Sequence, residues 1–484
     1  MKENAFTHYN RDNTLYSRLL AAAGDDKLPV LDNKTFESMN AEYGKEEMRK
    51  NLADYIATER PVFPLKEISE DDMRNCFNGL KNFNTNSICT PKDQVDKEVF
   101  EKYDDYEYSY DKYGLGLING PSTFNDVSNF FMQDLRLECG SYGFRAPKEV
   151  WENGDAYAIW KCLGPIWRGI NDVKLTKVKD LDGNETEQLL GGSLTHKSYI
   201  SAFRLGTYIA TQFKPVVAKA IYDMTNAKTV LDTSCGWGDR LCGFFASKKT
   251  TVYIGCDPNP NTFERYKKQC IEYETILTGH APKITETKDR FMSVGEKRVV
   301  IYRSGAEDIP YEKFPPIDCA FTSPPYFSTE TYNKGGEHEE DQSWSKFSEY
   351  ESWRDDFFIP VSKKSFEVLS DNGHLLINIM NPKIKGKMFP SCDEVVDELR
   401  EHFKGQIGMR IMQRPQSSTA FLEKWSEVKG ENDSNQVSDK EGIDRTAMQD
   451  FMKKLYMENV WWFAKEDKDL FLPNKHNSLE SFFE

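Results

Sequence analysis

Short apolar runs alternate with amphipathic stretches from about residue 195 to residue 465. The apolar runs predict strands at 228–231, 251–256, 298–302, 317–321 and 373–379. Helical periodicity between them predicts helices at 216–224, 241–245, 343–369 and 393–403. This alternation is typical of a parallel sheet with helices on both faces. With two further strands at 408–413 and 459–464, the pattern predicts an α/β fold around a mostly parallel, seven-stranded sheet.

Residues 1–190 lack this alternation and are predicted to form a mainly helical region. Helices are expected near 35–57, 69–82, 123–138 and 148–163. Ser69, with Asp72 three residues later, resembles a capping box. The aromatic residues Trp151, Tyr157, Trp160 and Trp167 are expected to build a small core rather than a base-stacking surface. The polar, turn-rich stretch at 174–192 is interpreted as a linker, and 466–484 as a C-terminal tail.

Composition narrows the classes of protein to consider. The chain of 484 residues is 38% hydrophobic, yet no apolar run approaches the length of a membrane span. No signal core follows Met1, so a soluble, intracellular (cytoplasmic) protein of prokaryotic or viral origin is expected. The ten cysteines include no Cys-x-x-Cys pair and the seven histidines suggest no ligand cluster, so no metal is expected. A net charge of -15 argues against a protein that coats nucleic acid, but leaves room for a local basic groove.

A glycine loop follows the first of the predicted strands. The sequence Asp232-Thr233-Ser234-Cys235-Gly236-Trp237-Gly238 separates this strand from the next helix. Strand, glycine loop and helix in this order bring the backbone close to a ligand at a helix N-terminus. The third glycine of the dinucleotide fingerprint is missing, so a dehydrogenase site fits poorly. After the second strand, the Asp257 carboxylate can accept hydrogen bonds from a ribose diol, although an aspartate here is also a common helix cap.

The run at 317–321 leads into Thr322-Ser323-Pro324-Pro325-Tyr326-Phe327. Two successive prolines cannot continue a strand or a helix, so the motif lies at the carboxyl edge of the sheet, where α/β proteins bind ligands. The Ser323 hydroxyl and the Pro324 carbonyl can accept hydrogen bonds, and the Tyr326 ring offers a flat face. These groups suit a planar ring that carries an amino group. A rigid surface turn or a polyproline-like segment is the alternative.

This motif resembles that of the amino-methyltransferases, the S-adenosylmethionine-dependent enzymes that methylate the exocyclic nitrogen of adenine or cytosine in DNA. The resemblance implies a class I methyltransferase fold over about residues 210–465, with a catalytic motif made of Ser323, Pro324, Pro325 and Tyr326. It also implies S-adenosyl-L-methionine as the cofactor, held by Phe213, Asp232, Ser234, Gly236, Gly238 and Asp257. Either Glu307 or Asp308 would accept the adenine amino group of that cofactor. Ser234-Cys235 departs from the Pro-Phe or Phe-x pairing that is commoner in the DNA enzymes.

The reaction implied is direct methyl transfer to a base amino nitrogen of DNA. Cytosine N4 is slightly favoured over adenine N6, because Ser-Pro-Pro-Tyr is found more among the N4-cytosine enzymes. The two acceptors would hold both N–H groups so that the nitrogen presents its lone pair, while Tyr326 stacks on a base flipped out of the duplex. The alternatives are an RNA base methyltransferase, a small-molecule methyltransferase, and an inactive methyltransferase fold that serves as a binding subunit.

Contacts with DNA are predicted at Phe327 and at a lysine triplet in the loop beyond the strand at 373–379. The triplet consists of Lys383, Lys385 and Lys387, which could hold phosphates or simply be solvated. The order of the motifs leaves little room for a recognition domain inside or after the sheet. We therefore expect residues 1–190 to touch the nucleic acid, and 191–465 to form the methyltransferase domain. The sequence does not identify the recognition sequence, a restriction partner or the oligomeric state.

Overall fold

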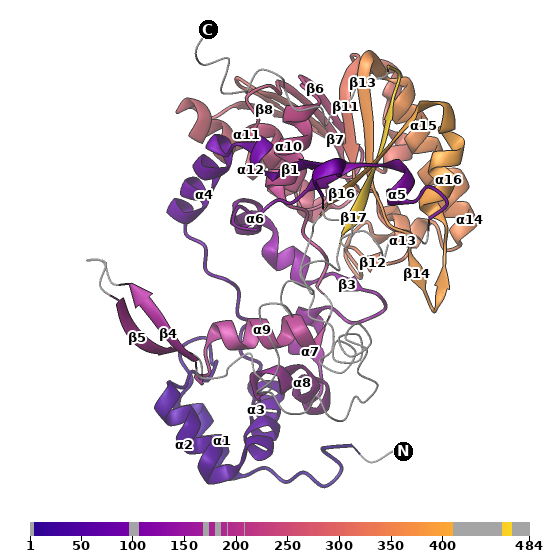
Figure 1. Ribbon diagram of the computed structural model, residues 1–484. Helices are drawn as coiled ribbons and strands as arrows, with labels where there is room; N and C mark the ends of the chain where they lie inside the picture. The colour runs from indigo at the N-terminus through magenta and orange to yellow at the C-terminus, as the bar shows by residue number, and fades with distance from the viewer. Residues whose placement is uncertain are drawn as a thin grey trace. The chain divides into compact units, whose positions relative to one another are not determined.

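A computed structural model describes residues 4–95, 106–167, 174–179, 185–190, 192–207, 209–409 and 457–466. The chain forms two compact units, shown in Figure 1. The first unit contains Met1–Asp72, Asn129–Thr211 and Ser328–Trp344, and the second contains Met73–Ser128, Gln212–Phe327 and Ser345–Glu484. The chain therefore passes between the units five times, including once directly after Phe327.

The second unit is built on one large sheet with a parallel centre. Its parallel strands are, in spatial order, β10 (Arg298–Tyr302), β7 (Val252–Cys256), β6 (Thr229–Asp232), β11 (Ile317–Thr322) and β13 (Leu369–Asn378). β17 (Glu458–Ala464) lies antiparallel between β13 and β16 (Phe403–Met409). This order, with β17 inserted antiparallel beside the fifth parallel strand, is that of a class I methyltransferase. The predicted α/β fold is confirmed.

The sheet is larger than predicted. Two strands extend one edge, β9 (Arg290–Val294) and β8 (Lys283–Glu286), and two extend the other, β2 (Gly114–Ile118) and β1 (Cys89–Pro91). Among the described residues the sheet thus has eleven strands instead of seven. β8 carries mostly exposed residues, so no apolar run marks it in the sequence. β2 is short, and it pairs with β16 from almost 300 residues away, Met409 lying opposite Ile118.

Helices cover both faces of this sheet (Figure 1). α10 (Pro215–Met224), α11 (Asp239–Ala246) and α12 (Pro260–Thr278) lie on one side, and α15 (Ile359–Glu367) and α16 (Ser391–Glu398) on the other. An aromatic core fills the space between the second pair and the strands, with Trp353, Phe358, Trp461 and Phe463 among its buried members. Shorter elements of this unit are η1 (Thr85–Ile88), η2 (Lys92–Gln94), α5 (Tyr110–Tyr113), η5 (Ala306–Asp308), η6 (Tyr311–Lys313), α14 (Tyr350–Ser352), the π-helical η8 (Trp353–Phe358), β14 (Lys383–Ile384), β15 (Lys387–Met388) and η9 (Arg400–His402).

The first unit is mainly helical. Its helices are α1 (Asn13–Ala21), α2 (Asn33–Tyr43), α3 (Lys45–Glu59), α7 (Pro147–Asn153), α8 (Ala156–Leu163), η4 (Gly164–Trp167), α9 (His196–Gly206) and η7 (Glu339–Asp341). Its strands form two small sheets, β3 (Gly140–Ser141) with β12 (Glu330–Thr331), and β4 (Lys174–Lys179) with β5 (Glu185–Leu190). α4 (Glu70–Asn82), α6 (Asp126–Leu137) and α13 (Ser343–Lys346) each continue from one unit into the other. Trp151, Tyr55 and Phe203 are buried in its core, while Trp160 and Trp167 pack against it.

The structure tests several local predictions made from the sequence. The Ser69 hydroxyl accepts from the Asp72 N–H at 3.0 Å and Asp72 accepts from the Ser69 N–H at 3.1 Å, so the predicted capping box is confirmed. The helix predicted at 35–57 is interrupted at Gly44, which has a φ of 86°. The predicted linker at 174–192 contains the β4–β5 strand pair. The charged stretch at 425–446 and nearly all of the tail at 466–484 lie outside the described residues.

The division into units differs from the sequential one expected at residue 190. Residues 73–128 belong to the second unit because β2 completes the sheet beside β16 and because Phe77 stacks on Tyr273 of α12, with ring centroids 4.9 Å apart. Residues 328–344, expected inside the methyltransferase domain, belong to the first unit. Within the parts of the chain that the structure describes, no helix is both long enough and apolar enough to cross a bilayer.

Candidate active site

The glycine loop follows β6, and the Ser-Pro-Pro-Tyr motif follows the neighbouring strand β11. β6 and β11 are parallel neighbours, with Leu231 opposite Ala320. Just beyond this pair, the Thr233 hydroxyl donates a hydrogen bond to the Thr322 hydroxyl at 3.0 Å. Ser323 therefore begins its loop beside the loop of Ser234, at the carboxyl edge of the parallel strands. The structure thus brings together the two motifs that the sequence separates by about 90 residues.

The two glycines of the loop serve different purposes. Gly236 has a φ of 54°, and a Cβ there would approach only the Ser234 carbonyl among the described atoms, at 3.7 Å. The space beside the Gly236 Cα is therefore free of described atoms, while its N–H donates to Asp257 and its carbonyl accepts from Tyr266. Gly238, with a φ of 72°, lies against the buried Gln269 side chain, whose Oε1 would be 2.1 Å from a Cβ. A side chain at Gly238 would have to displace the buried Gln269 amide and would be strained by the positive φ, so glycine is favoured here on both grounds.

Asp232 organises the loop from a buried position. Its side chain is fully buried and accepts hydrogen bonds from Arg240 Nε at 2.9 Å and from the Tyr253 hydroxyl at 2.7 Å. It also accepts from the Ser234 N–H at 3.1 Å, while the Ser234 carbonyl accepts from Arg240. A direct contact between Asp232 and the cofactor is thus not what the structure shows. Asp232 forms its ion pair with Arg240, the second residue after Gly238. The sequence alone did not identify this pairing.

Asp257 follows β7 and is held by four hydrogen bonds. Its carboxylate accepts from the Gly236 N–H at 2.9 Å, the Tyr266 hydroxyl at 3.0 Å, the Asn259 N–H at 2.9 Å and the Thr262 hydroxyl at 3.3 Å. Burial raises the pKa of Asp257 to about 6, although these hydrogen bonds oppose the rise. Because its acceptor positions are already used, a diol would take the place of a hydroxyl such as that of Tyr266.

Between the two candidate acids, the structure favours Glu307. Its Oε1 forms an ion pair with Lys346 at 2.5 Å, and its Oε2 is buried without a hydrogen-bond partner among the described residues. A buried carboxylate oxygen without a partner is costly unless a ligand donates to it, and an adenine amino group is such a donor. The Asp308 side chain is 62% exposed and shares the same lysine at 3.3 Å. Glu307 therefore fits the adenine end of the expected cofactor.

In the Ser-Pro-Pro-Tyr motif, Pro324 is buried, and Ser323, Pro325 and Tyr326 are half-buried. The Tyr326 hydroxyl donates to the Asn378 carbonyl at the end of β13 and lies 3.2 Å from Glu458 Oε2 at the start of β17. The Asn378 side chain also donates to this Glu458 oxygen, at 3.2 Å. The orientation of the Tyr326 ring is thus fixed by two strands, which sequence reasoning missed because Glu458 lies over 130 residues away.

Phe327 and the lysine triplet occupy different surroundings. Phe327 is 5% exposed, and its ring packs against Tyr350, Trp353 and Phe389, so it is a core residue and not a surface for a base. The lysines are exposed on the β14–β15 hairpin, in which Ile384 pairs with Lys387. The Lys387 ammonium lies 4.6 Å from the centroid of the Phe389 ring. Phe389 thus links the base of the hairpin to the end of the catalytic motif.

Phe213 lies next to the strand that carries the motif. Its ring meets Phe321 of β11 edge-on at 5.5 Å, and the Arg240 guanidinium lies 5.6 Å from its centroid. The preceding Gln212 donates to Asp239 at 3.0 Å, and Ser128 also donates to this carboxylate. This buried network at the start of α11 was not predicted, because Ser128 lies far away in the sequence.

Two cysteines lie near this edge of the sheet. Burial raises the pKa of the Cys235 and Cys256 thiols well above the ordinary value. Thiols in such surroundings stay protonated and are poor nucleophiles. Neither of these two thiols is therefore activated as a nucleophile.

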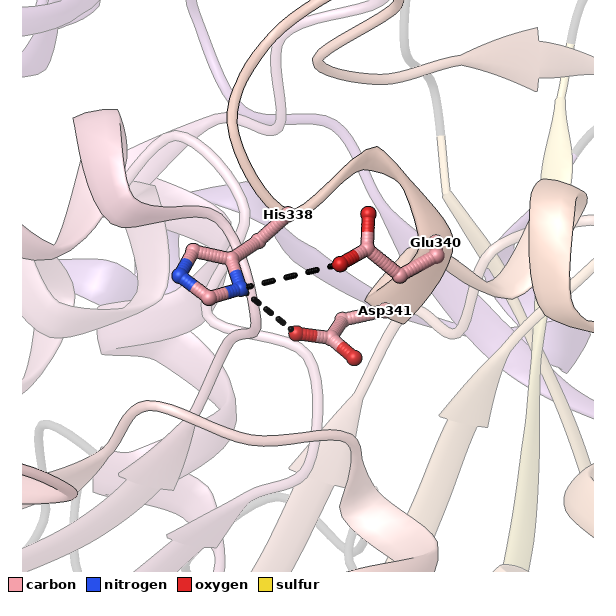
Figure 2. Close-up of side chains that lie close together, drawn as sticks. All are labelled: His338, Glu340 and Asp341. Carbon is pink, nitrogen blue, oxygen red and sulfur yellow. Dashed lines mark ion pairs between the residues drawn. The ribbon is translucent and has the colours of Figure 1, made fainter.

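The first unit contains a group of three side chains with metal-ligand chemistry, His338, Glu340 and Asp341 (Figure 2). His338 Nδ1 lies 3.2 Å from Asp341 Oδ2 and 4.0 Å from Glu340 Oε1. The sequence had suggested no such cluster. The two carboxylates are 55% and 77% exposed, so their arrangement is that of a surface ion pair around the imidazole. A further carboxylate, that of Glu337, lies 3.7 Å from the other ring nitrogen, His338 Nε2.

Comparison with protein families gives one match. Residues 317–480 match the N6/N4 methyltransferase family, whose description is DNA methylase. The match begins at the first residue of β11 and covers about a third of the chain. A comparison with curated proteins found no match.

Solved structures with some likeness to this chain are methyltransferases. Trm1 from Pyrococcus horikoshii in complex with S-adenosyl-L-methionine is 15% identical, with a TM-score of 0.25 over 35% of this chain and 38% of Trm1. Geranyl diphosphate methyltransferase in complex with the same cofactor is 12% identical, with a TM-score of 0.27 over 52% of this chain and 85% of its own. The complex of the Haloferax volcanii Trm112 activator with a methyltransferase is 12% identical, with a TM-score of 0.28 over 52% and 90%. Likenesses this weak say nothing of the substrate.

Proposed function

We propose that this chain methylates the exocyclic amino nitrogen of a base in DNA, because residues 317–480 match the DNA methylase family of N6- and N4-methyltransferases. The observation that carries the proposal is the position of Ser323-Pro324-Pro325-Tyr326 beside the open glycine loop. The same edge provides Asp257 and the unpartnered Glu307 oxygen. The family match supports S-adenosylmethionine as the methyl donor.

The residues at the sheet edge fit this cofactor in three places. The backbone at Gly236 offers room for its methionine part, Asp257 for its ribose and Glu307 for its adenine amino group. When bound, the cofactor supplies an electrophilic methyl group. Asp232 and Arg240 hold the loop from behind through their buried ion pair. Because this pair is buried beneath the loop, we expect backbone atoms of the loop to contact the cofactor.

We propose that the motif aligns a weak nucleophile, the amino nitrogen of the base, with the methyl group. The lone pair of an exocyclic amino nitrogen is delocalised into the base, so the amino group must turn pyramidal before it reacts. The Ser323 hydroxyl and the Pro324 carbonyl accept its two N–H groups and favour that geometry. The Tyr326 ring stacks on the base. Because Asn378 and Glu458 hold the Tyr326 hydroxyl, the ring is already in place before the base arrives.

The substrate must also be held by its phosphates. The exposed lysines of the β14–β15 hairpin lie in the unit that carries the motif, and Phe389 connects the two. Lysine ammonium groups hold phosphates without reading sequence. The same hydrogen-bond acceptors suit cytosine N4 and adenine N6. We favour cytosine N4, from the serine at the first position of the motif.

We assign sequence recognition to the first unit. Deleting residues 1–190 would also remove β1, β2 and part of α4 from the second unit, so loss of activity in that deletion would not report on recognition. Point substitutions on the surface of the first unit are the informative test.

Methyl transfer from labelled S-adenosylmethionine to unmethylated DNA, and in parallel to RNA, tests the proposed function. Mass spectrometry of the nucleosides identifies the product. Label in N4-methylcytosine or N6-methyladenine of DNA is expected with the wild-type chain and is lost in Ser323→Ala. Ser352→Ala, which changes an equally half-buried serine of the same unit, should keep full activity. Label confined to RNA, or no label despite cofactor binding, would contradict the proposal.

A further inference from the structure

The side chain of Tyr266, on α12, reaches the glycine loop. Its hydroxyl donates to the Gly236 carbonyl and also lies 3.0 Å from Asp257 Oδ2. The whole side chain is buried. No sequence signal pointed to it, because Tyr266 lies 30 residues beyond Gly236. A single hydroxyl thus touches both the loop and the acid that follows β7.

Both polar groups of the Gly236 backbone are held by side chains. The N–H donates to Asp257 at 2.9 Å, and the carbonyl accepts from Tyr266, its donor among the described residues. Few atoms pack beside this residue, since a Cβ there would come within 4 Å only of the Ser234 carbonyl. The position of the loop at Gly236 therefore depends on these two hydrogen bonds.

The start of α12 holds Tyr266 and Asp257 in register. Asp257 Oδ1 accepts from the Asn259 N–H at 2.9 Å and from the Thr262 hydroxyl at 3.3 Å, which ties the carboxylate to the first turn of the helix. Tyr266 comes four residues after Thr262 and so lies on the same face of the helix. One helix thus positions both groups that hold Gly236.

The Tyr266 hydroxyl has one proton and two acceptors within reach. A ribose diol beside Asp257 would supply that carboxylate with donors of its own. The Gly236 carbonyl would gain no donor from the ribose and would still need Tyr266. With a ribose in place, the Tyr266 proton therefore serves the glycine loop alone.

We propose that Tyr266 is a positioning residue that fixes the glycine loop for the methionine part of S-adenosylmethionine, while Asp257 binds the ribose. This role rests on the proposed function and deepens it, because it divides the cofactor affinity between two neighbouring side chains. Without the hydroxyl, the Gly236 carbonyl loses its donor and turns away in the free chain. The loop must then be brought back when the methionine part binds, and a ligand without that part does not require this step.

The test compares two ligands on the full-length chain. S-adenosylhomocysteine contains the nucleoside and the amino-acid part, whereas 5′-methylthioadenosine lacks the amino-acid part. Tyr266→Phe removes the hydroxyl and keeps the ring, and Asp257→Asn changes the group that binds the ribose of both ligands. Tyr199→Phe is the matched control, because Tyr199 of the first unit is also fully buried and donates to a backbone carbonyl, that of Pro29, at 2.8 Å.

Tyr266→Phe should raise the Kd for S-adenosylhomocysteine about tenfold, since a buried carbonyl loses its hydrogen bond. The same variant should change the Kd for 5′-methylthioadenosine less than about twofold, because that ligand does not use the loop. Asp257→Asn should weaken both ligands by similar factors, and Tyr199→Phe should weaken neither.

The readout is the ratio of the two Kd values, so a partly unfolded sample, which weakens both ligands equally, does not imitate the expected effect. The thermal midpoint without ligand checks folding. Tyr266→Met, which fills the space of the ring with a flexible side chain, replaces the phenylalanine variant if the latter does not fold.

Equal losses for the two ligands in Tyr266→Phe would overturn the proposal, because the hydroxyl would then support the fold and not the loop. Unchanged Kd values for both ligands would overturn it too. A wild-type chain that binds neither ligand overturns the proposed function itself, whereas wild-type binding with an unchanged ratio in Tyr266→Phe contradicts only the role of Tyr266.

Discussion

The proposed function gives the Asp257 carboxylate a binding role in addition to its structural one. The carboxylate ties Gly236 to α12 through four hydrogen bonds, and burial raises its pKa to about 6. A ribose diol donates hydrogen bonds, so it binds the ionised form better. Protonation of Asp257 and binding of the cofactor therefore compete.

We expect the affinity for S-adenosylmethionine to fall as the pH drops below about 6, approaching a tenfold rise in Kd per pH unit if only the ionised form binds. Calorimetric titrations between pH 7.5 and 5 would measure this. In Asp257→Asn the Kd should be weaker and nearly independent of pH. A wild-type Kd that stays constant over this range would show that the carboxylate does not contact the cofactor.

Without the cofactor, the raised pKa of Asp257 makes the free energy of unfolding depend on pH in the opposite direction to the cofactor affinity. The folded-state pKa of Asp257 is raised, so the folded chain binds this proton more tightly than the unfolded chain. The contribution of this residue to the free energy of unfolding is fully present below the unfolded pKa of about 3.9 and is lost as the pH rises through about 6. Near neutral pH the cofactor thus binds the ionised form of Asp257, whereas the folded chain without cofactor is more stable with Asp257 protonated.

Glu307 and Asp308 are adjacent in the sequence but differ in what their oxygens contact. Loss of a hydrogen bond to a charged acceptor costs about 1.5–3 kcal/mol, so Glu307→Ala should raise the Kd for S-adenosylmethionine at least tenfold. Asp308→Ala should change it less than about twofold, because that side chain is largely exposed. Isothermal titration of both variants measures the difference. A larger effect at Asp308 would reverse the assignment.

The residues that the sequence could identify are those whose role is local. Ser323 and Asp257 follow a strand directly, and Pro324 and Gly236 lie in the loops that begin there, and a strand end is visible in the hydrophobic pattern. Arg240, Tyr266 and Glu458 could not be found in this way, because their function comes from a partner that only folding brings near. Phe327 was misplaced for the same reason: its aromatic neighbours at Tyr350 and Phe389 come from later elements.

Among the elements, the strands buried on both faces were predictable and the edge strands were not. β6, β7, β10, β11 and β13 are apolar runs because helices cover both of their faces. β8 and β2 lie towards the edges of the sheet, where fewer neighbours demand apolar side chains. The order of strands followed from the resemblance to a family, since periodicity alone does not specify which strands pair.

β2 makes a segment from the first quarter of the chain part of the catalytic unit. Ile118 at its end is fully buried beside Met409 of β16. Ile118→Ala should destabilise the second unit by about 2–4 kcal/mol through lost burial and a cavity. Val294→Ala, at a valine 44% exposed on β9 of the same sheet, is the matched control.

Urea titration with and without S-adenosylmethionine identifies the transition of the second unit, because only that transition should shift with the ligand. The Ile118 variant should lower its midpoint and the Val294 variant should not. If Ile118→Ala left the midpoint unchanged, the N-terminal segment would not be an integral part of the sheet.

The whole chain carries a net charge of -15, which repels a polyanion at long range. This repulsion is screened beyond about 8 Å at physiological salt, so contacts are governed by the charges nearest to the phosphates. The β14–β15 hairpin places Lys383, Lys385 and Lys387 together on an exposed turn. With this charge distribution, most of the surface should bind DNA weakly. The affinity for DNA should depend mainly on the lysines of the β14–β15 hairpin.

Replacing the three hairpin lysines by alanine should therefore reduce DNA affinity and lower the slope of log K against log salt by up to about three, because each phosphate contact contributes about 0.9. The Kd for S-adenosylmethionine should not change. Lys248→Ala/Lys249→Ala, which changes exposed lysines just before β7, is the control, since it lies at the amino edge of the sheet, away from the motif. An unchanged salt slope in the hairpin variant would mean that other cations hold the backbone, and those of the first unit would be the next to test.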